Sequence, residues 1–114
     1  TTIRRDGLSL SQREIEAIGS GGLSGAPLRE RSLDVLRRLR ARVGDQVTLI
    51  SVGGIEDGDE AFRRIKAGAS LVQIYTGYIY GGPGLPKRME RELLAAMRRE
   101  GFDSIQKAIG AGEG

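Results

Sequence analysis

Two short β-rich segments, each closed by glycine and separated by one amphipathic helix, constrain the fold of this chain more than any other feature. Residues 47–52 read Val-Thr-Leu-Ile-Ser-Val, and residues 70–75 read Ser-Leu-Val-Gln-Ile-Tyr. Because neither run alternates cleanly between apolar and polar residues, we expect strands that are covered on both faces, as in a parallel sheet. A strand, a glycine turn, a helix and a second strand within about thirty residues form a βαβ unit with a right-handed crossover. The sequence therefore predicts an α/β fold.

Capping residues and apolar spacing predict the helices. Ser11 and Glu14 have the spacing of a capping box at the start of a short helix, and Asp57 and Glu60 are expected to be the N-cap and reciprocal partner of the helix between the strands. The expected apolar faces are Leu33, Leu36, Leu39 and Val43 over residues 28–43, then Ala61, Phe62 and Ile65, then Leu85, Met89, Leu93 and Met97 in a long helix to about Glu100. A last short helix is predicted near residues 104–109.

The number of strands indicates that this chain is part of something larger. Two parallel strands alone would leave an unpaired edge on each side, so we expect them to belong to a larger sheet or barrel. The sequence has no internal repeat and no flexible linker, and it begins with Thr1 rather than Met. We interpret residues 1–114 as one segment of a single domain whose beginning is missing.

Missing residue types exclude several kinds of chemistry. The chain has no cysteine and no histidine, which excludes a zinc finger, a disulfide framework, a thiol nucleophile and a Ser-His-Asp triad. Function must rest on carboxylates, hydroxyls, lysine, arginine, backbone amides or a bound cofactor. We expect no metal site, because the acidic residues within 56–60 lack the spacing of a calcium loop and suit a helix N-terminus.

Basic residues on one predicted helix suggest nucleic-acid binding as another function. Residues 37–42 contain four arginines in a chain whose net charge is +3. Acidic residues share the helix and no aromatic residue is interleaved for base stacking, so we expect a solvated helix face and no nucleic-acid partner. A basic nucleic-acid-binding module is the least favoured alternative.

Three glycine-containing turns occupy comparable places. Residues 21–25 precede a helix, Gly53-Gly54 follows the first strand, and Thr76-Gly77 follows the second. Glycine lets backbone N–H groups approach an anion closely, and in (β/α)₈ barrels a phosphate commonly binds after strands 7 and 8. The alternative is that these glycines only close tight turns, and their spacing matches neither the Rossmann fingerprint nor the Walker loop. We favour phosphate binding.

Four motifs occur in a characteristic order. They are Gly-Gly-Leu-Ser-Gly at 21–25 followed by Pro27-Leu28, Ser-Val-Gly-Gly-Ile at 51–55, Ala-Gly-Ala-Ser-Leu-Val-Gln-Ile-Tyr-Thr-Gly at 67–77, and Gly-Gly-Pro at 81–83. As a set, they resemble the carboxyl-terminal part of class 2 dihydroorotate dehydrogenase, the quinone-linked class. The opening Thr1-Thr2-Ile3 resembles the end of that family's Asn-Thr-Thr segment. The resemblance runs nearly end to end here but covers only the closing part of the family's chain.

The resemblance implies a fold, a cofactor and site residues. The fold is the last two to three βα units of a (β/α)₈ TIM barrel that holds FMN. In that family dihydroorotate is oxidised to orotate in de novo pyrimidine biosynthesis, and a quinone reoxidises the flavin. Carried over residue by residue, the cofactor-binding residues are Gly25, Gly54, Tyr75 and Thr76. Thr1 falls on a threonine that contacts the pyrimidine.

The resemblance also implies what lies outside these residues. The family's catalytic base is a serine in an earlier segment, so we expect no catalytic residue here and no activity from this segment alone. We interpret Ser24, Ser32 and Ser51 as loop, helix and strand hydroxyls rather than as that base. The remainder of the barrel is the expected partner. The implied location is cytoplasmic, peripheral at the inner face of the cell membrane through a segment absent from this sequence.

Two alternatives stay open at the level of sequence. The runner-up function is that of another FMN-binding or phosphate-binding barrel enzyme, which would have similar glycine turns. Gln73, a polar residue within an apolar strand, either forms a hydrogen bond inside a barrel or faces a ligand.

Overall fold

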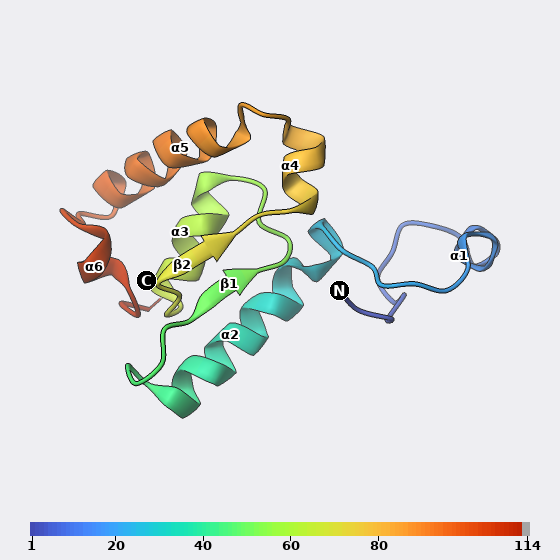
Figure 1. Ribbon diagram of the computed structural model, residues 1–114, viewed down its shortest axis with the longest axis horizontal. Coiled ribbons are helices and arrows are strands. Elements are labelled where there is room, and N and C mark those ends of the chain that lie inside the picture. Colours follow the sequence, from blue (N-terminus) through green and yellow to red (C-terminus); the bar gives the residue numbers. More distant parts are fainter. Residues whose placement is uncertain (113–114) are drawn as a thin grey trace.

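A pair of parallel strands lies at the centre of the fold in the computed structural model, which describes residues 1–112 (Figure 1). In chain order the elements are α1 (Gln12–Ile18), the 3₁₀ turn η1 (Ala26–Leu28), α2 (Arg29–Val43), β1 (Ile50–Val52), α3 (Gly58–Lys66), β2 (Leu71–Gln73), α4 (Thr76–Gly81), α5 (Leu85–Arg99) and α6 (Ile105–Ala108). The predicted βαβ unit is confirmed as β1, α3 and β2.

The sheet is shorter and more open than predicted. Its paired residues are Ile50 with Leu71, Ser51 with Val72, and Val52 with Gln73. The expectation that both faces are covered is wrong within residues 1–112. Ser51 is buried, whereas Ile50, Val52 and Leu71, on the opposite face, are 56%, 49% and 57% exposed. The reason is that α3 packs against β2 on one face, while α2 lies alongside β1 and leaves the other face largely open (Figure 1).

The apolar faces predicted for the helices form most of the core. Phe62 and Ile65 of α3 pack against Ala96 and Met97 of α5, and the ring of Phe62 meets that of Phe102 edge to face, with centroids 5.7 Å apart. The other two buried clusters are Ile55, Ala61, Leu85 and Met89, and Leu33, Leu36 and Ala69. The core therefore lies between the sheet and α3, α5 and α2, on the side away from the open strand face.

The segment before α2 forms an arm that extends away from the sheet. Ser11 and Glu14 make the predicted capping box at the start of α1, and α1 buries none of its residues. Figure 1 shows α1 apart from the other helices. Thr2 and Leu23 close the base of the arm, because each backbone N–H donates to the other residue's carbonyl oxygen at 3.0 and 2.8 Å.

The acidic residues around the start of α3 have separate structural roles. Asp57 is the predicted N-cap, since its side chain accepts a hydrogen bond from the backbone N–H of Glu60 at 2.7 Å. The expected reciprocal bond from Glu60 is replaced by an ion pair with Arg64 at 2.6 Å. Asp59 pairs with Arg99 at 2.6 Å. No group of three potential metal-ligating side chains occurs within residues 1–112.

Helix α2 is also linked to α3 across the surface. Arg63 donates two hydrogen bonds to the carboxylate of Glu30, which lower the pKa of Glu30 below its ordinary value. Because the pKa is lowered in the folded state, this link is complete above the ordinary glutamate pKa and is lost as the pH falls through the lowered value.

Helix α4 was not anticipated from the sequence. The sequence predicts a turn at Thr76 and Gly77, but they are the first residues of α4. Glycine disfavours a helix, yet a Cβ at Gly77 would lie 2.6 Å from the carbonyl oxygen of Ile55. Close packing between the helix and the chain after β1 therefore overrides local propensity.

We predict that Asp57→Ala lowers the free energy of unfolding by about 1 kcal/mol, because the N-cap acceptor of α3 is lost. Asp57→Asn keeps a side-chain acceptor and should recover most of that loss. Urea denaturation of the three proteins measures the difference. Equal stability of the Ala and Asn variants would contradict the capping role.

Candidate functional site

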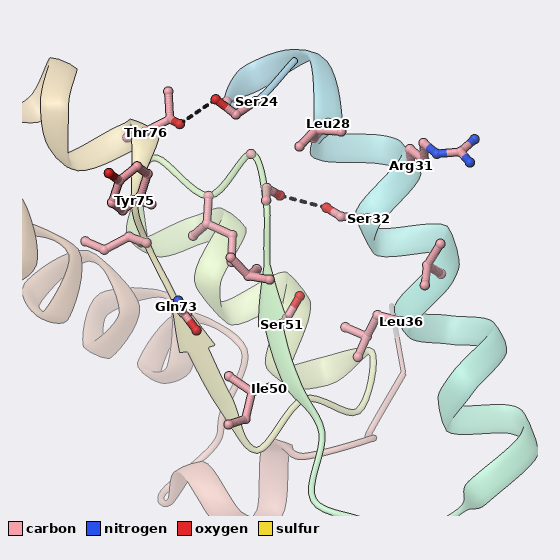
Figure 2. Close-up of a pocket in the computed structure, with 18 of the residues that line it drawn as sticks. Ser24, Leu28, Arg31, Ser32, Leu36, Ile50, Ser51, Gln73, Tyr75 and Thr76 are labelled. Atoms are coloured by element: carbon pink, nitrogen blue, oxygen red, sulfur yellow. Dashed lines mark hydrogen bonds between the residues drawn. The ribbon is translucent and has the colours of Figure 1, made fainter. Parts of the chain in front are cut away.

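The ends of both strands and the loop before α2 meet at one pocket (Figure 2). Its volume is about 460 Å³, and its wall is more apolar than polar. The lining residues are Thr1, Ser24, Gly25, Leu28, Arg31, Ser32, Val35, Leu36, Leu39, Leu49, Ile50, Ser51, Val52, Gly53, Gly54, Ile55, Gln73, Ile74, Tyr75, Thr76 and Gly77. All five site residues named from the sequence therefore line a single pocket.

Gly25 and Thr76 approach one another although they are far apart in the sequence. Gly25 has φ of +83°, and a Cβ there would lie 2.9 Å from the Cγ2 atom of Thr76. Next to this contact, the hydroxyls of Ser24 and Thr76 are 2.8 Å apart and form a hydrogen bond (Figure 2). Glycine is required here both for its backbone conformation and for the space it leaves.

The Gly53-Gly54 turn is pressed against α2. Gly54 has φ of +74°, and a Cβ on it would lie 2.5 Å from the Cα of Arg29. Its carbonyl oxygen accepts a hydrogen bond from Nε of Arg29 at 3.1 Å, and Arg29 also pairs with Glu56 at 2.8 Å. Within residues 1–112, the backbone N–H groups of Gly54 and Gly25 donate no hydrogen bond to the chain. Two residues that line the pocket thus carry backbone N–H groups with no acceptor in the described part of the chain.

Thr1 and Tyr75 lie at the rim of the pocket. The Thr2–Leu23 pair holds Thr1 against Gly22, where an added Cβ would lie 2.8 Å from the Cβ of Thr1. Tyr75 follows β2 directly and is 76% exposed. The side chain of Tyr75 therefore does not belong to the core.

The open face of the sheet forms the apolar wall. Ile50, Val52 and Gln73 line the pocket together, and Figure 2 shows Ile50 and Gln73 along the strands, below Thr76. Gln73 therefore faces the pocket rather than α3. Arg31 also lines the pocket, but its guanidinium extends away from the strands (Figure 2).

The serine hydroxyls that line the pocket all have partners within the chain. Ser24 bonds to Thr76, Ser32 donates to the carbonyl oxygen of Gly53 at 2.7 Å, and Ser51 accepts from Arg64 at 3.2 Å. No histidine can serve as a base for them, because the whole sequence lacks this residue. No helix among residues 1–112 has both the length and the apolar character needed to cross a bilayer.

Two contacts at the site could not be found from the sequence. The Ser24–Thr76 hydrogen bond joins residues 52 positions apart, and the buried Arg64 reaches Ser32 and Ser51 from α3. Arg64 occupies a position in α3 one turn after Glu60, and this i, i+4 spacing is the only signal in the sequence. Such spacing is common on exposed helix faces, so it does not indicate burial.

Glycine turns at the carboxyl ends of parallel strands, beside a mostly apolar pocket, are typical of α/β proteins that bind ligands at this edge of the sheet. The family model described as dihydroorotate dehydrogenase matches residues 1–97. The chain belongs to the dihydroorotate dehydrogenase family.

Individual relatives agree with the family match. The chain is 61% identical to dihydroorotate dehydrogenase (quinone) of Thermobifida fusca over 110 residues, which are 96% of this chain and 29% of that protein. It is 61% identical to the protein of the same name from Rhodococcus opacus over 112 residues, which are 98% of this chain and 32% of that one. A crystal structure of ligand-free DHODH from Eimeria tenella is similar with a TM-score of 0.88 and 40% identity, over 97% of this chain and 30% of that chain. The chain thus spans about a third of these relatives' length.

Close approach at Gly54 can be separated from backbone strain. Gly82 has the same φ of +74° but nothing within 4 Å of an added Cβ. We predict that Gly82→Ala lowers the free energy of unfolding by about 1–2 kcal/mol through strain alone. Gly54→Ala should cost roughly 1–3 kcal/mol more, because its Cβ overlaps the backbone of α2. Chemical denaturation measures both, and equal losses would show that contact with Arg29 is unimportant.

Proposed function

We propose that this chain is the carboxyl-terminal segment of a quinone-linked dihydroorotate dehydrogenase, and that its pocket binds the phosphate of FMN. The observation that carries the proposal is the convergence of Gly25, Gly54 and Thr76 on one pocket. These residues come from three separate segments, and the family resemblance assigns the same three to the flavin phosphate. A role in closing turns alone would not require their convergence.

The residues at this edge fit a phosphate in their chemistry. A phosphate dianion needs several donors and tolerates no acceptor pointed at it. Gly25 and Gly54 offer backbone N–H groups that are unused within residues 1–112, and Thr76 offers a hydroxyl hydrogen-bonded to Ser24. Glycine at positions 25 and 54 lets Thr76 and the backbone of Arg29 pack directly against these turns, where a Cβ would overlap them. Tyr75 lies at the rim of the pocket, and the family resemblance assigns it to the flavin phosphate as well.

The apolar wall of the pocket fits the flavin ring and the pyrimidine substrate. When bound, FMN supplies the ring system that accepts the hydride of dihydroorotate. Thr1, at the same pocket, would contact the pyrimidine, and Gln73 offers an amide along the wall. The exposed strand face of Ile50, Val52 and Leu71 becomes barrel interior once the remaining strands are added.

The proposal assigns binding to this segment and chemistry to other segments. The family resemblance implies that the base that takes a proton from dihydroorotate is a serine in an earlier segment, and Ser24, Ser32 and Ser51 of this chain are engaged with Thr76, Gly53 and Arg64. This segment alone is therefore inactive. Electrons leave to a quinone, and the protein works on the cytoplasmic side of the membrane, where it meets that acceptor.

The test uses the polypeptide that carries this sequence in its source organism. We expect it to purify yellow, to release FMN on denaturation as identified by mass and absorbance, and to reduce a soluble quinone when dihydroorotate is added. A colourless protein with no released flavin would contradict the proposal. Release of a different phosphorylated cofactor would favour another phosphate-binding barrel enzyme.

Thr76 allows a sharper test of the phosphate contact. Thr76→Val keeps the shape of the side chain and removes the hydroxyl, which costs about 1.5–3 kcal/mol for a bond to a charged group, or roughly ten- to a hundredfold in FMN affinity. Riboflavin has no phosphate, so its affinity should hardly change. Thr48→Val, outside the pocket, is the matched control and should bind both flavins as the wild type does. Equal loss of FMN and riboflavin binding in Thr76→Val would contradict the contact.

A further inference from the structure

Arg64 of α3 is fully buried, although it does not line the pocket. Its guanidinium donates five hydrogen bonds, one for each N–H group. The acceptors are Oε1 of Glu60 at 2.6 Å from Nε, the hydroxyls of Ser32 at 2.7 Å and Ser51 at 3.2 Å from Nη1, and the carbonyl oxygens of Arg29 at 2.7 Å and Gly53 at 3.2 Å from Nη2. One side chain thus joins α3, the first turn of α2 and the end of β1.

Stability alone does not account for this arrangement. A buried ion pair such as Arg64–Glu60 pays a large desolvation cost, and a well-packed apolar pair often stabilises a protein as well or better. An apolar pair could not, however, hold carbonyl and hydroxyl oxygens in fixed directions. Four of the five acceptors of Arg64 are uncharged oxygens next to the glycine turn. This indicates that Arg64 serves to orient the groups that carry these oxygens.

The carbonyl of Gly53 is the acceptor nearest the pocket's donors. It accepts from Nη2 of Arg64 at 3.2 Å and from Oγ of Ser32 at 2.7 Å, the bond drawn from Ser32 in Figure 2. The Gly53–Gly54 peptide bond is trans, so its C=O and N–H groups point in opposite directions. Fixing the carbonyl against Arg64 therefore directs the N–H of Gly54 away from the buried guanidinium.

We propose that Arg64 is a positioning residue for phosphate binding, acting through the Gly53–Gly54 peptide without touching the ligand. Its hydrogen bond holds that peptide in the orientation that presents the N–H of Gly54 to the phosphate. Donation to the carbonyl also polarises the peptide, which strengthens its N–H as a donor. This inference rests on the proposed function, since it requires a phosphate at the pocket.

The test compares FMN with riboflavin in the polypeptide that carries this sequence. Arg64→Met keeps the apolar length of the side chain and removes its five donors. We expect FMN to bind about tenfold more weakly or worse, and riboflavin to change by less than about twofold, in calorimetric titrations. A purely structural Arg64 would weaken both flavins equally, or lower the melting temperature and leave both affinities intact. Arg38→Met is the matched control, because Arg38 is exposed and its ion pair within residues 1–112 is with Asp34 on the surface of α2.

A second variant covers the case in which Arg64→Met does not fold. Ser32→Ala removes the other donor to the carbonyl of Gly53 and also the 2.7 Å acceptor that fixes Nη1 of Arg64, while the Arg64–Glu60 pair stays in place. It should lower FMN affinity severalfold and leave riboflavin affinity unchanged. If Arg64→Met folds and keeps the wild-type preference for FMN, the inference is overturned. If it does not fold, an unchanged preference in Ser32→Ala overturns it. A wild-type protein with no preference for FMN over riboflavin would instead refute the proposed function.

Discussion

The parallel pairing of β1 with β2 is the interaction on which the site depends. Because the strands run in the same direction, their carboxyl ends and the turns that follow them lie at one edge of the sheet. The register pairs Val52 with Gln73, so Gly53-Gly54 and Tyr75-Thr76 enter the same pocket. An antiparallel pair would separate these turns to opposite ends. The loop at residues 21–25 completes the pocket because α2 starts beside the same edge.

The glycines of this chain serve close approach more than flexibility. At Gly54 and Gly25 the space for a Cβ is already filled by Arg29 and Thr76. Beside Gly54, the buried Arg64 donates to the hydroxyl of Ser32 and to the carbonyl of Gly53, which also accepts from Ser32. Acceptors beside the turn thus point to Arg64, whereas the backbone N–H groups of Gly25 and Gly54 have no acceptor within residues 1–112. A site with this division suits an anion.

The sequence predicted the periodic and local parts of the structure. The capping box at Ser11, the N-cap at Asp57 and the apolar face of α3 follow from neighbours within one or two turns, and all are confirmed. The helix at residues 76–81 was missed because tertiary packing at Gly77 outweighs its low propensity. Coverage of both sheet faces was predicted from the lack of clean alternation in the two strands, a pattern that reports the environment in a whole domain and not that in one segment. The residues assigned to the cofactor came from motif order and stay a prediction, although they line one pocket.

The proposed function explains both the open apolar face of the sheet and the hydrogen-bond donors at its edge. Further strands would close the sheet, and a flavin phosphate would occupy the edge. A crystal structure of the polypeptide that carries this sequence, with FMN bound, tests that account most directly. We predict phosphate oxygens within hydrogen-bond distance of the N–H groups of Gly25 and Gly54 and of Oγ1 of Thr76. A flavin phosphate bound elsewhere, with these three groups facing only solvent, would contradict it.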